Sequence, residues 1–307
     1  MNRRRAIGIL SATAFSSCGR SNPLRNFSSI AFGTEVHFQT HGISQSAFEK
    51  ISSVCSARIR EIEALFSLYD PQSTLSKLNH EGRLDNPPTE FLELIRTALD
   101  YGEKTGGIFD ITVQPLWDWR QKWKEAGLEE RQALHANSWD KALTLVDYRH
   151  VKAVRDTISF GKPGMAITLN GIVQGHATDS IVTLLKKLGV RNALVNIGEY
   201  AALGTAQNGK PWSVELAANG ETIPLPPGRA LAVSAGSGHT FDPEGRFHHI
   251  FRPADGASTR PDSTIVVTAP TATIADALST TFTVASGNNR QKILKIFPKA
   301  DFREIKP

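Results

Sequence analysis

A carboxylate and a hydroxyl lie close together near the C-terminal end of the sequence, within "APTATIADALSTTFTVASG". Asp276 is the only charged residue of this run, and Thr280 follows it four positions later. In an α-helix, residues four apart share one face and lie one turn from each other. The two side chains would then present two oxygens to the same point. The residues alone also allow a second interpretation, in which Asp276 is a helix cap or a buried hydrogen-bond acceptor.

Three other segments carry polar residues that a hydrophobic core does not need. "TGGIFDITVQPLW" places Asp110 among apolar residues, and "GRFHHIFRPADGAS" places His248 and His249 beside an Arg-Pro turn. In "ITLNGIVQGHATD", Gly171 and Gln174 lie between a predicted strand and a predicted helix, where backbone N–H groups could meet an anion. Taken singly, each segment is more typical of an ordinary turn or of a structural or solvated histidine. None of them assigns a function alone.

The composition is that of a globular chain and does not point to nucleic acid or to a membrane span. The chain has 307 residues, of which 40% are apolar and 21% charged. The formal charge of +5 falls to +2 without the three arginines at positions 3–5, so we expect no nucleic-acid partner and no attraction to an anionic membrane surface. No apolar run approaches the roughly 20 residues of a transmembrane helix. The sequence also lacks GxGxxG, P-loop and zinc-ligand spacings.

The N-terminal segment "MNRRRAIGILSATAFSSCGR" predicts an export signal over residues 1–18. A basic cluster precedes a short apolar stretch, which small residues follow. Cys18 could be a lipoprotein site, so we expect a periplasmic protein or a lipid-anchored one that faces the periplasm, with no other membrane contact. The alternative is a cytosolic protein with a basic tail. After cleavage only Cys55 would remain, which excludes an intramolecular disulfide.

The order of the expected elements favours an α+β fold with mixed or antiparallel sheets over a doubly wound one, because strands and helices do not alternate strictly. A polar linker over residues 19–29 precedes one domain over residues 30–307. The patterns predict helices from about Ser46 and over 87–107 and 176–190, and a helix that carries Asp276. The charged segment over about 117–136 is expected to be another helix or a surface excursion. They predict a loop over 68–82 and strands over 28–42, 165–169, 193–197, 212–217, 230–235 and 263–270.

Six segments in this order resemble the FAD:protein FMN transferases, the ApbE-type flavin transferases. They are "YDPQSTLSKLN", "TGGIFDITVQPLW", "ITLNGIVQGHATD", "LVNIGEYAALG", "HHIFRPADG" and "APTATIADALSTTFTV". Each is weak alone, but together they cover the chain from about Ala31 to near its C-terminus. An exported leader fits this resemblance, since such proteins act on periplasmic or membrane-attached redox proteins.

The resemblance implies an ApbE-type architecture, a substrate, a metal and a reaction. Asp276, Thr280 and an oxygen of Gly171 would hold Mg²⁺ at the pyrophosphate of FAD. FMN would pass from FAD to a Ser or Thr hydroxyl of an exported or membrane redox protein, AMP would leave, and His249 would be the base. By the same resemblance, the flavin contacts would be Phe32, Tyr69, Ile108, Phe109, Asp110, Thr168, Gln174 and Ile250.

The chain also departs from the pattern of this family. Thr168 stands at a position usually occupied by Asp, and Gln174 at a position usually occupied by Lys or Glu. Arg252 and Asp255 replace the Asp and the Thr of a "DPxTG"-like turn. Two alternatives therefore accompany the transferase hypothesis. One is an FAD-binding protein with weakened catalysis, and the other is an FAD pyrophosphatase that gives FMN and AMP.

Overall fold

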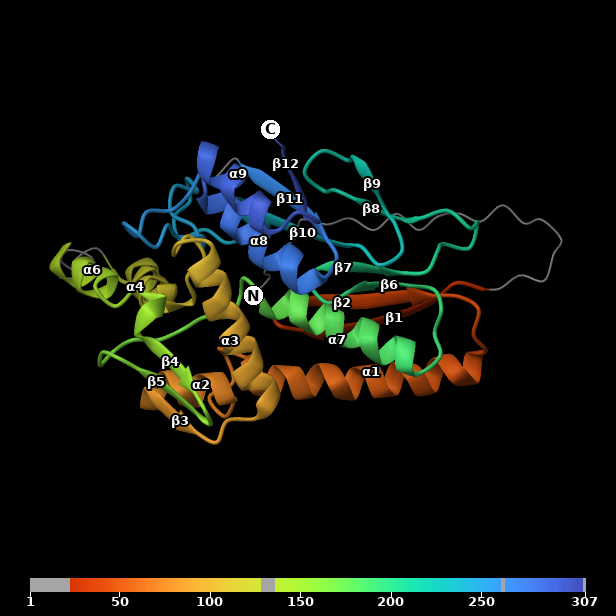
Figure 1. Ribbon diagram of the computed structural model, residues 1–307, viewed down its shortest axis with the longest axis horizontal. Coiled ribbons are helices and arrows are strands. Elements are labelled where there is room, and N and C mark those ends of the chain that lie inside the picture. The colour runs from red at the N-terminus through yellow and green to blue at the C-terminus, as the bar shows by residue number, and fades with distance from the viewer. Residues whose placement is uncertain (1–22, 128–135, 261–262, 306–307) are drawn as a thin grey trace.

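A seven-stranded antiparallel sheet forms the centre of the protein. The computed structural model describes residues 23–127, 136–260 and 263–305. The strand order is β1-β2-β6-β7-β10-β11-β12, and every neighbouring pair is antiparallel. The expectation of an α+β fold is therefore confirmed (Figure 1). The strands are β1 (Arg25–Ala31), β2 (Thr34–Thr40), β6 (Ala193–Asn196), β7 (Tyr200–Leu203), β10 (Ala230–Ala235), β11 (Thr264–Ala269) and β12 (Asp301–Ile305).

The first two strands form a hairpin where the sequence predicts one strand over 28–42. The turn consists of Phe32 and Gly33, with φ of 51° and 70°. Positive φ at both central residues is typical of the two-residue turns whose twist matches that of the flanking strands. Because β1 begins at Arg25, residues 25–29 belong to the sheet, and the predicted linker over 19–29 was wrong in this part. The predicted export signal lies outside the described residues.

The two faces of the sheet are covered differently, and the alternation of side chains along each strand explains this. Ala193 and Val195 of β6 pack into the core beneath α1 (Gln45–Phe66) and α7 (Val173–Lys187), and Leu194 points to the other face. A small hairpin of β8 (Trp212–Glu215) and β9 (Thr222–Leu225) covers that other face. The helix α8 (Ala272–Val284) packs on β10 and β11, beside α7 (Figure 1). The helix α9 (Gly287–Ile296) follows it.

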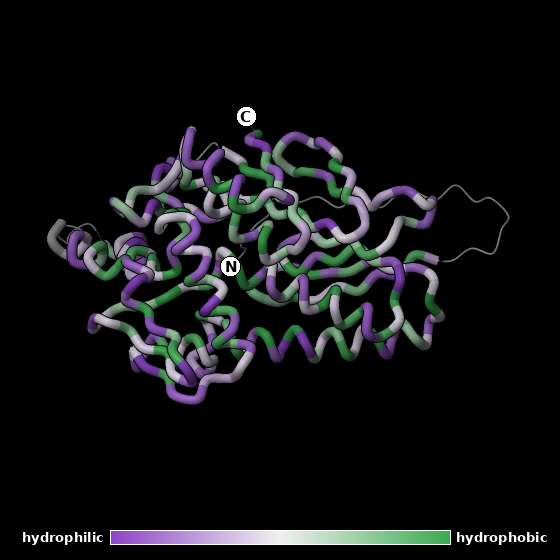
Figure 2. The backbone as a smooth tube through the Cα atoms, viewed as in Figure 1, coloured by the Kyte–Doolittle hydropathy of each residue, from purple (hydrophilic) through white to green (hydrophobic). Residues whose placement is uncertain are grey.

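The long helix α1 is amphipathic, as the sequence predicts. Its buried residues Ile51, Cys55, Ile59, Ile62 and Phe66 recur every three or four positions. Apolar and polar residues alternate along it in Figure 2. Ser44 caps its start by accepting a hydrogen bond from the N–H of Ala47 at 3.2 Å. The helix therefore starts one residue before the expected position.

A second lobe is inserted between α1 and α7 and lies at one end of the sheet (Figure 1). It contains a predicted helix, α3, and a second helix within the segment 68–82, for which the sequence predicts a loop. That helix, α2, begins after Ser73, whose hydroxyl accepts a hydrogen bond from the N–H of Ser76 at 3.0 Å. The elements are α2 (Thr74–Glu81), α3 (Thr89–Lys104), α4 (Gln114–Glu125), α6 (Ala136–Leu143) and the three-stranded antiparallel sheet β3 (Arg83–Asp85), β5 (Thr157–Phe160) and β4 (Val151–Val154).

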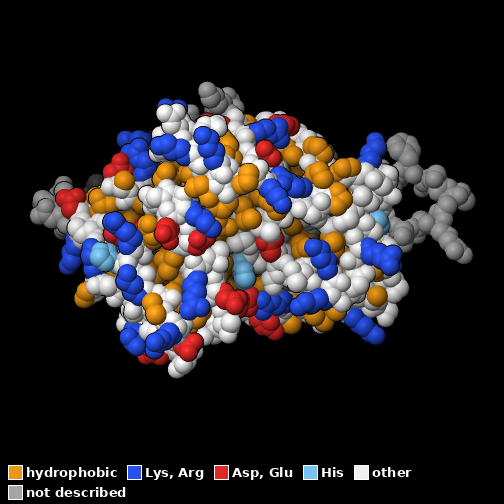
Figure 3. Space-filling view, in the orientation of Figure 1, with side chains coloured by type: hydrophobic (Ala, Val, Ile, Leu, Met, Phe, Trp, Pro, Cys, Tyr) orange, Lys and Arg blue, Asp and Glu red, His pale blue; other side chains and the backbone are white. Residues whose placement is uncertain are grey.

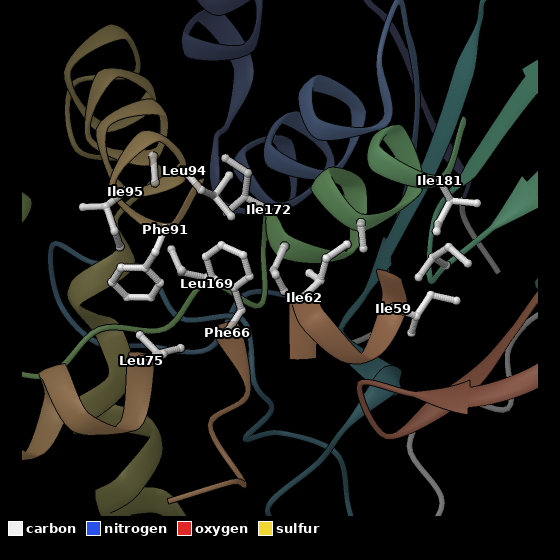
Figure 4. Packing of buried hydrophobic residues seen from close by; sticks show 14 of the residues in the cluster. Ile59, Ile62, Phe66, Leu75, Phe91, Leu94, Ile95, Leu169, Ile172 and Ile181 are labelled. Carbon is white, nitrogen blue, oxygen red and sulfur yellow. The ribbon is translucent and has the colours of Figure 1, made fainter. Parts of the chain in front are cut away.

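The two lobes share one hydrophobic core, which supports the segment between the lobe and α7. Figure 4 shows Leu169 and Ile172 packed among side chains of α1 and α3. The rings of Phe66 and Phe91 stack there with centroids 5.4 Å apart. This packing holds the polar turn at 168–171 in a fixed place.

The segment 165–169 is not the strand that the sequence predicts. It forms no ladder with a described strand, and the side chain of Asn79 pairs with its backbone instead. The Asn79 amide donates to the carbonyl of Ile167 and accepts from its N–H, both at 2.8 Å. The N–H of Thr168 donates to the carbonyl of Ile111 at 2.8 Å. Side chain and loop thus satisfy the backbone groups that a ladder would otherwise pair.

The exposed surface shows no single dominant charge on the face seen in Figure 3, where Lys and Arg are interspersed with Asp and Glu. In the part of the chain that the structure describes, no helix is long and apolar enough to span a membrane. The one cysteine of this part, Cys55, is buried in α1, and burial raises the pKa of its thiol to about 12. Its thiol is therefore a core group.

Candidate functional site

Two adjoining hollows lie between the sheet and the second lobe. They enclose about 690 and 740 Å³ of empty space, open solvent included. Trp117, Asn170 and His249 line both, so the two form one continuous site. We name them the Tyr69 hollow and the Thr280 hollow.

The two hollows draw on segments that are far apart in the sequence. The Tyr69 hollow is lined by Phe32, Thr34, Phe66, Ser67, Leu68, Tyr69, Trp117, Asn170, Val173, Gln174, Gly238, His239 and His249. The Thr280 hollow is lined by Ile108, Phe109, Asp110, Ile111, Val113, Gln114, Trp117, Thr168, Asn170, Gly171, Ser234, His249, Ile250, Phe251, Pro253, Thr280 and Val284. All predicted site residues except Asp276 are therefore in these walls.

Asp276 lies behind the wall of the Thr280 hollow, one helical turn before Thr280. Its side chain is 3% exposed, and Oδ2 accepts a hydrogen bond from the N–H of Gly175 at 2.9 Å. The interpretation as a buried hydrogen-bond acceptor is thus correct for this contact. A carboxylate has two oxygens, so the same group can accept a backbone hydrogen bond and bind a cation.

Gly171 and Thr280 are in close contact at the surface of the hollow. A Cβ added to Gly171 would lie 3.1 Å from Oγ1 of Thr280. The carboxylate of Asp276, the hydroxyl of Thr280 and the backbone oxygen of Gly171 are hard oxygens, the donor type that suits Mg²⁺. Within the described ranges no three His, Cys, Asp or Glu residues are grouped so that they could hold a metal ion, so an ion here would depend on one carboxylate, a hydroxyl and backbone oxygens.

The two neighbouring histidines have different environments. His248 is fully buried, with Nε2 2.8 Å from the carbonyl of Thr259 and Nδ1 accepting from the N–H of Ile250 at 3.3 Å. Burial lowers the pKa of His248, so its ring stays neutral. His248 is therefore a structural residue, and His249 is the one that reaches both hollows.

His249 is oriented by a backbone carbonyl. Its Nδ1 lies 3.2 Å from the carbonyl oxygen of His239. Since a carbonyl only accepts, the neutral ring carries its proton on Nδ1 and its lone pair on Nε2. This is the tautomer that a general base needs when the reacting proton approaches Nε2.

Asp110 holds the loop that forms one wall of the Thr280 hollow. Its Oδ1 accepts from the N–H and the hydroxyl of Thr112 at 2.8 and 2.6 Å, and its Oδ2 accepts from the N–H of Tyr148 at 2.9 Å. Desolvation by burial raises the pKa of Asp110 above its ordinary value, and these hydrogen bonds oppose the shift. The structure therefore gives this carboxylate a structural part in the wall.

Thr168 and Gln174 flank the polar turn. The hydroxyl of Thr168 accepts from the N–H of Asn170 at 3.2 Å and so closes the turn. Gln174 is 7% exposed and packs on Gly198, where an added Cβ would lie 2.5 Å from Cδ of Gln174. Gln174 belongs to the first turn of α7, not to the segment before the helix as the sequence predicts, and its amide is held against the loop that follows β6.

Arg252 and Asp255, which stand at the Asp and Thr positions of the family turn, form an ion pair with each other. Arg252 Nε donates to Oδ1 of Asp255 at 3.1 Å, and one terminal nitrogen donates to Oδ2 at 2.7 Å. Asp255 Oδ1 also accepts from the N–H of Ala257 at 3.0 Å. The substituted pair therefore still closes the turn that follows His249.

Sequence reasoning missed the aromatic wall between the hollows. Trp117 stacks on His239 with ring centroids 4.7 Å apart and planes at 27°. Trp117 belongs to the segment "TGGIFDITVQPLW", but α4 contains further tryptophans at positions 119 and 123. Only their rotation about the helix decides which one faces the site, and the sequence does not mark it.

Comparison with solved structures shows that the fold is that of the flavin transferases. An ApbE protein from Thermotoga maritima matches 92% of this chain and 94% of its own with a TM-score of 0.78 at 27% identity. The apo flavinyl transferase ApbE from Pseudomonas stutzeri matches 93% and 95% with a TM-score of 0.77 at 20% identity. The ApbE family profile matches residues 32–301, and the chain belongs to the ApbE family.

Similar curated proteins carry one functional name. The FAD:protein FMN transferase of Haemophilus influenzae is 28% identical over 296 residues, covering 89% of this chain and 84% of its own length. That of Treponema pallidum is 30% identical over 245 residues, covering 70% and 65%. The resemblance stated from the six sequence segments is thus confirmed at the level of the family.

Proposed function

We propose that this protein is a Mg²⁺-dependent FAD:protein FMN transferase that releases AMP. One observation carries the proposal: Gly171 and Thr280, next to Asp276, lie in the same hollow as His249. That hollow opens into a second one with the aromatic side chains Phe32 and Tyr69. A site for phosphate chemistry and a site for a flat ring are therefore contiguous, as a dinucleotide substrate requires.

The Thr280 hollow would hold the pyrophosphate of FAD. Asp276, Thr280 and a backbone oxygen of Gly171 would bind Mg²⁺ there, and the ion would supply Lewis-acid stabilisation of phosphoryl charge. Asp276 is the one carboxylate among these three residues, so it alone would offset charge on the ion. The positive charge of a divalent cation and the negative charge of a pyrophosphate would largely neutralise each other when both are bound, so the two together would bind better than either alone.

The Tyr69 hollow would receive the isoalloxazine ring. Tyr69 is 58% exposed at its rim, and its aromatic ring would stack on the isoalloxazine there. Phe32 and Trp117 form further apolar wall. Exclusion of water by these rings would strengthen the electrostatic contacts in the neighbouring hollow.

His249 would act on the incoming hydroxyl. The hydroxyl oxygen of a Ser or Thr in the acceptor protein attacks the phosphorus on the FMN side, and its proton passes to Nε2 of His249. The bond between that phosphorus and the AMP oxygen breaks, and AMP leaves with the electron pair. The His239 carbonyl at 3.2 Å holds the ring and stabilises the proton on Nδ1 as the second proton arrives.

The acceptor would be a redox protein outside the cytoplasm. This part of the proposal rests on the leader "MNRRRAIGILSATAFSSCGR" and on the enzyme class. An export signal over residues 1–18 would place the domain in the periplasm, with Cys18 as a possible lipid anchor. Nothing in the net charge of the mature chain requires another membrane contact.

The test is incubation of purified protein with FAD and Mg²⁺, with and without a candidate acceptor. The proposal expects AMP only when the acceptor is present, together with in-gel flavin fluorescence on the acceptor band. AMP and FMN without acceptor labelling would instead indicate a pyrophosphatase. Tight FAD binding without AMP would indicate a binding protein with weakened catalysis, as the replacements Thr168 and Gln174 allow.

A further inference from the structure

The helices α7 and α8 are joined in one fixed antiparallel register. Three contacts, each four residues from the next on both segments, define it. Gly171 lies against Thr280, Gly175 donates its N–H to Asp276 at 2.9 Å, and Asp179 meets the N-terminus of α8 at Ala272 and Thr273. Four residues are about one helical turn, so the contacts follow one another along a single line. The first two contain the residues assigned to the metal.

The middle contact requires close approach of the two helices. A Cβ on Gly175 would lie 2.3 Å from the carbonyl oxygen of Ala272 and 2.8 Å from Cβ of Asp276. Real Cβ atoms do not approach backbone oxygen at that distance, so glycine is required here. The close approach alone does not fix the register, because a flat contact between small residues would let α8 slide along α7.

Asp179 supplies the directional part of the contact. Its Oδ1 accepts from the N–H of Ala272 at 2.8 Å, and its Oδ2 accepts from the N–H and the hydroxyl of Thr273 at 2.8 and 2.6 Å. These N–H groups are among those that a helix leaves without internal partners, and the positive end of the helix dipole favours the carboxylate. Asp179 thus caps α8 from the neighbouring helix.

A second cap on the same helix has no such effect on position. Thr271 accepts from the N–H of Ile274 at 3.2 Å, and both residues belong to the start of α8 itself. A local cap of this kind stabilises α8 wherever the helix lies. The cap from Asp179 is formed only when the start of α8 lies on α7.

We propose that Asp179 is a positioning residue for the metal site: it fixes α8 on α7 so that Asp276 and Thr280 meet Gly171 at the Thr280 hollow. This inference rests on the proposed function, because it needs a metal at that corner. Its carboxylate does not touch the substrate. It acts through the three donors of Ala272 and Thr273, one helical turn from Asp276. Loss of these contacts would let α8 shift and would separate the oxygens that bind the ion.

The test compares Asp179→Ala and Asp179→Asn with Thr271→Ala, which removes the local cap of the same helix. The probe is Mn²⁺, whose free concentration is followed by electron paramagnetic resonance with FAD present, against a blank of FAD without protein. We expect Asp179→Ala to weaken Mn²⁺ binding by about tenfold or more, as loss of outer partners of metal ligands does. Asp179→Asn keeps one acceptor oxygen and should be intermediate. Thr271→Ala should lower the melting temperature and leave Mn²⁺ affinity unchanged.

Kinetics provide a second measurement that a merely structural role would not change. For Asp179→Asn, raising Mg²⁺ should restore the rate of AMP release toward that of the wild type, whereas Asp276→Ala should not respond. Wild-type Mn²⁺ affinity in folded Asp179→Ala, or an equal loss in Thr271→Ala, would overturn the inference and leave the proposed function standing. A wild-type protein that binds no Mn²⁺ with FAD would overturn both. If Asp179→Ala does not fold, the Asn variant decides.

Discussion

The imidazole rings of His248 and His249 lie 6.2 Å apart with their planes at 69°, and only that of His249 lines the hollows. The ring of His248 is enclosed and bonded to Thr259 and Ile250. Adjacent residues of an extended segment point to opposite sides, which gives the pair one structural and one accessible member. This difference makes each histidine the control for the other.

Replacement of His249 should affect the reaction and not the fold. We expect His249→Gln to lower the rate of FMN transfer by about 10²–10⁴-fold, the usual contribution of a general base. FAD affinity and melting temperature should stay close to those of the wild type, because the half-buried ring lines the hollows and the amide N–H of Gln can also donate to the His239 carbonyl. Single-turnover kinetics and calorimetry with FAD measure the two effects separately. An equal loss of rate and affinity would remove His249 from the role of base.

Replacement of His248 should have the reverse effect. His248→Ala removes a fully buried ring and leaves the carbonyl of Thr259 and the N–H of Ile250 without their partner. Each unsatisfied buried group costs about 1–3 kcal/mol, so unfolding should occur at clearly lower urea concentration. A variant with wild-type stability and no transfer activity would contradict the structural assignment.

The stability of the wild type should fall as the pH falls below about 6.5. The pKa of His248 is lowered in the folded state by desolvation, from 6.5. Below that value the unfolded chain binds a proton that the folded one excludes, so stability rises with pH in this window and is lost toward acid. Desolvation lowers the pKa of His37 as well, with the same sign. Urea titrations at several pH values should therefore show that the unfolding free energy depends less steeply on pH in His248→Gln than in the wild type. The same pH dependence in both proteins would contradict this role of His248.

Asp276→Asn separates the charge of this residue from its structural hydrogen bond. The amide oxygen of Asn can still accept from the N–H of Gly175, so the melting temperature should change little. The loss of charge should weaken Mg²⁺-dependent FAD binding by more than the roughly tenfold typical of an outer-shell change. Calorimetry of FAD with and without Mg²⁺ measures this.

Thr280→Val is the companion variant, because it keeps volume and β-branching and removes one oxygen. We expect a smaller loss of the same Mg²⁺-dependent kind. If Mg²⁺ makes no difference to FAD affinity in the wild type or in either variant, the metal assignment is wrong.

Substitution of a glycine in the α7–α8 contact should lower the unfolding free energy more than substitution of a glycine with open space around it. Gly175→Ala must displace the carbonyl of Ala272, which would lie 2.3 Å from the new methyl group, and should destabilise by about 1–3 kcal/mol or more. Gly127→Ala is the control, because nothing lies within 4 Å of its added Cβ. It should stay within about 0.5 kcal/mol of the wild type. Equal unfolding free energies for the two variants would contradict the close approach.

The leader should be absent from the mature protein. Cells that express the full chain should hold it outside the cytoplasm, with the chain cut near Cys18. Mass spectrometry of the extracted protein would show the new N-terminus, and a diacylglycerol-sized addition on Cys18 would identify a lipoprotein. Met1 retained in a cytosolic fraction would contradict export.

The sequence predicted the elements with strong periodicity and the family resemblance. The helices α1, α3, α7 and α8 and the strands β6, β10 and β11 of the large sheet have clear apolar patterns, and the structure confirms them, whereas β7 and β12 were not predicted. The strand expected over 165–169 failed for a physical reason. Its apolar alternation is real, but Asn79, distant in the sequence, takes the place of a partner strand. Periodicity describes burial and cannot say which group completes the backbone hydrogen bonds.

The hairpin and the short helix were missed because their signals are local and atypical. A two-residue turn normally contains Asn-Gly or Gly-Gly, and Phe32-Gly33 does not match that signature. Ser73 begins α2 inside a segment with strong turn residues, which concealed the cap. In the site, each residue was assigned through the family resemblance, and the division between His248 and His249 required the fold. The pairing of Arg252 with Asp255 likewise needs their geometry.

The backbone conformation of Phe32 lowers the stability of the fold, whereas its ring contributes to the site. A side chain in the left-handed region costs about 1–2 kcal/mol relative to an ordinary conformation, and glycine avoids this. Phe32 adopts φ of 51°, its N–H donates to Glu63 Oε1 at 2.7 Å, and its ring forms part of the Tyr69 hollow. A search for thermostable variants would therefore select Gly or Asn at position 32 and remove an aromatic wall at the same time. At position 32, we therefore expect substitutions that raise the melting temperature to lower the activity.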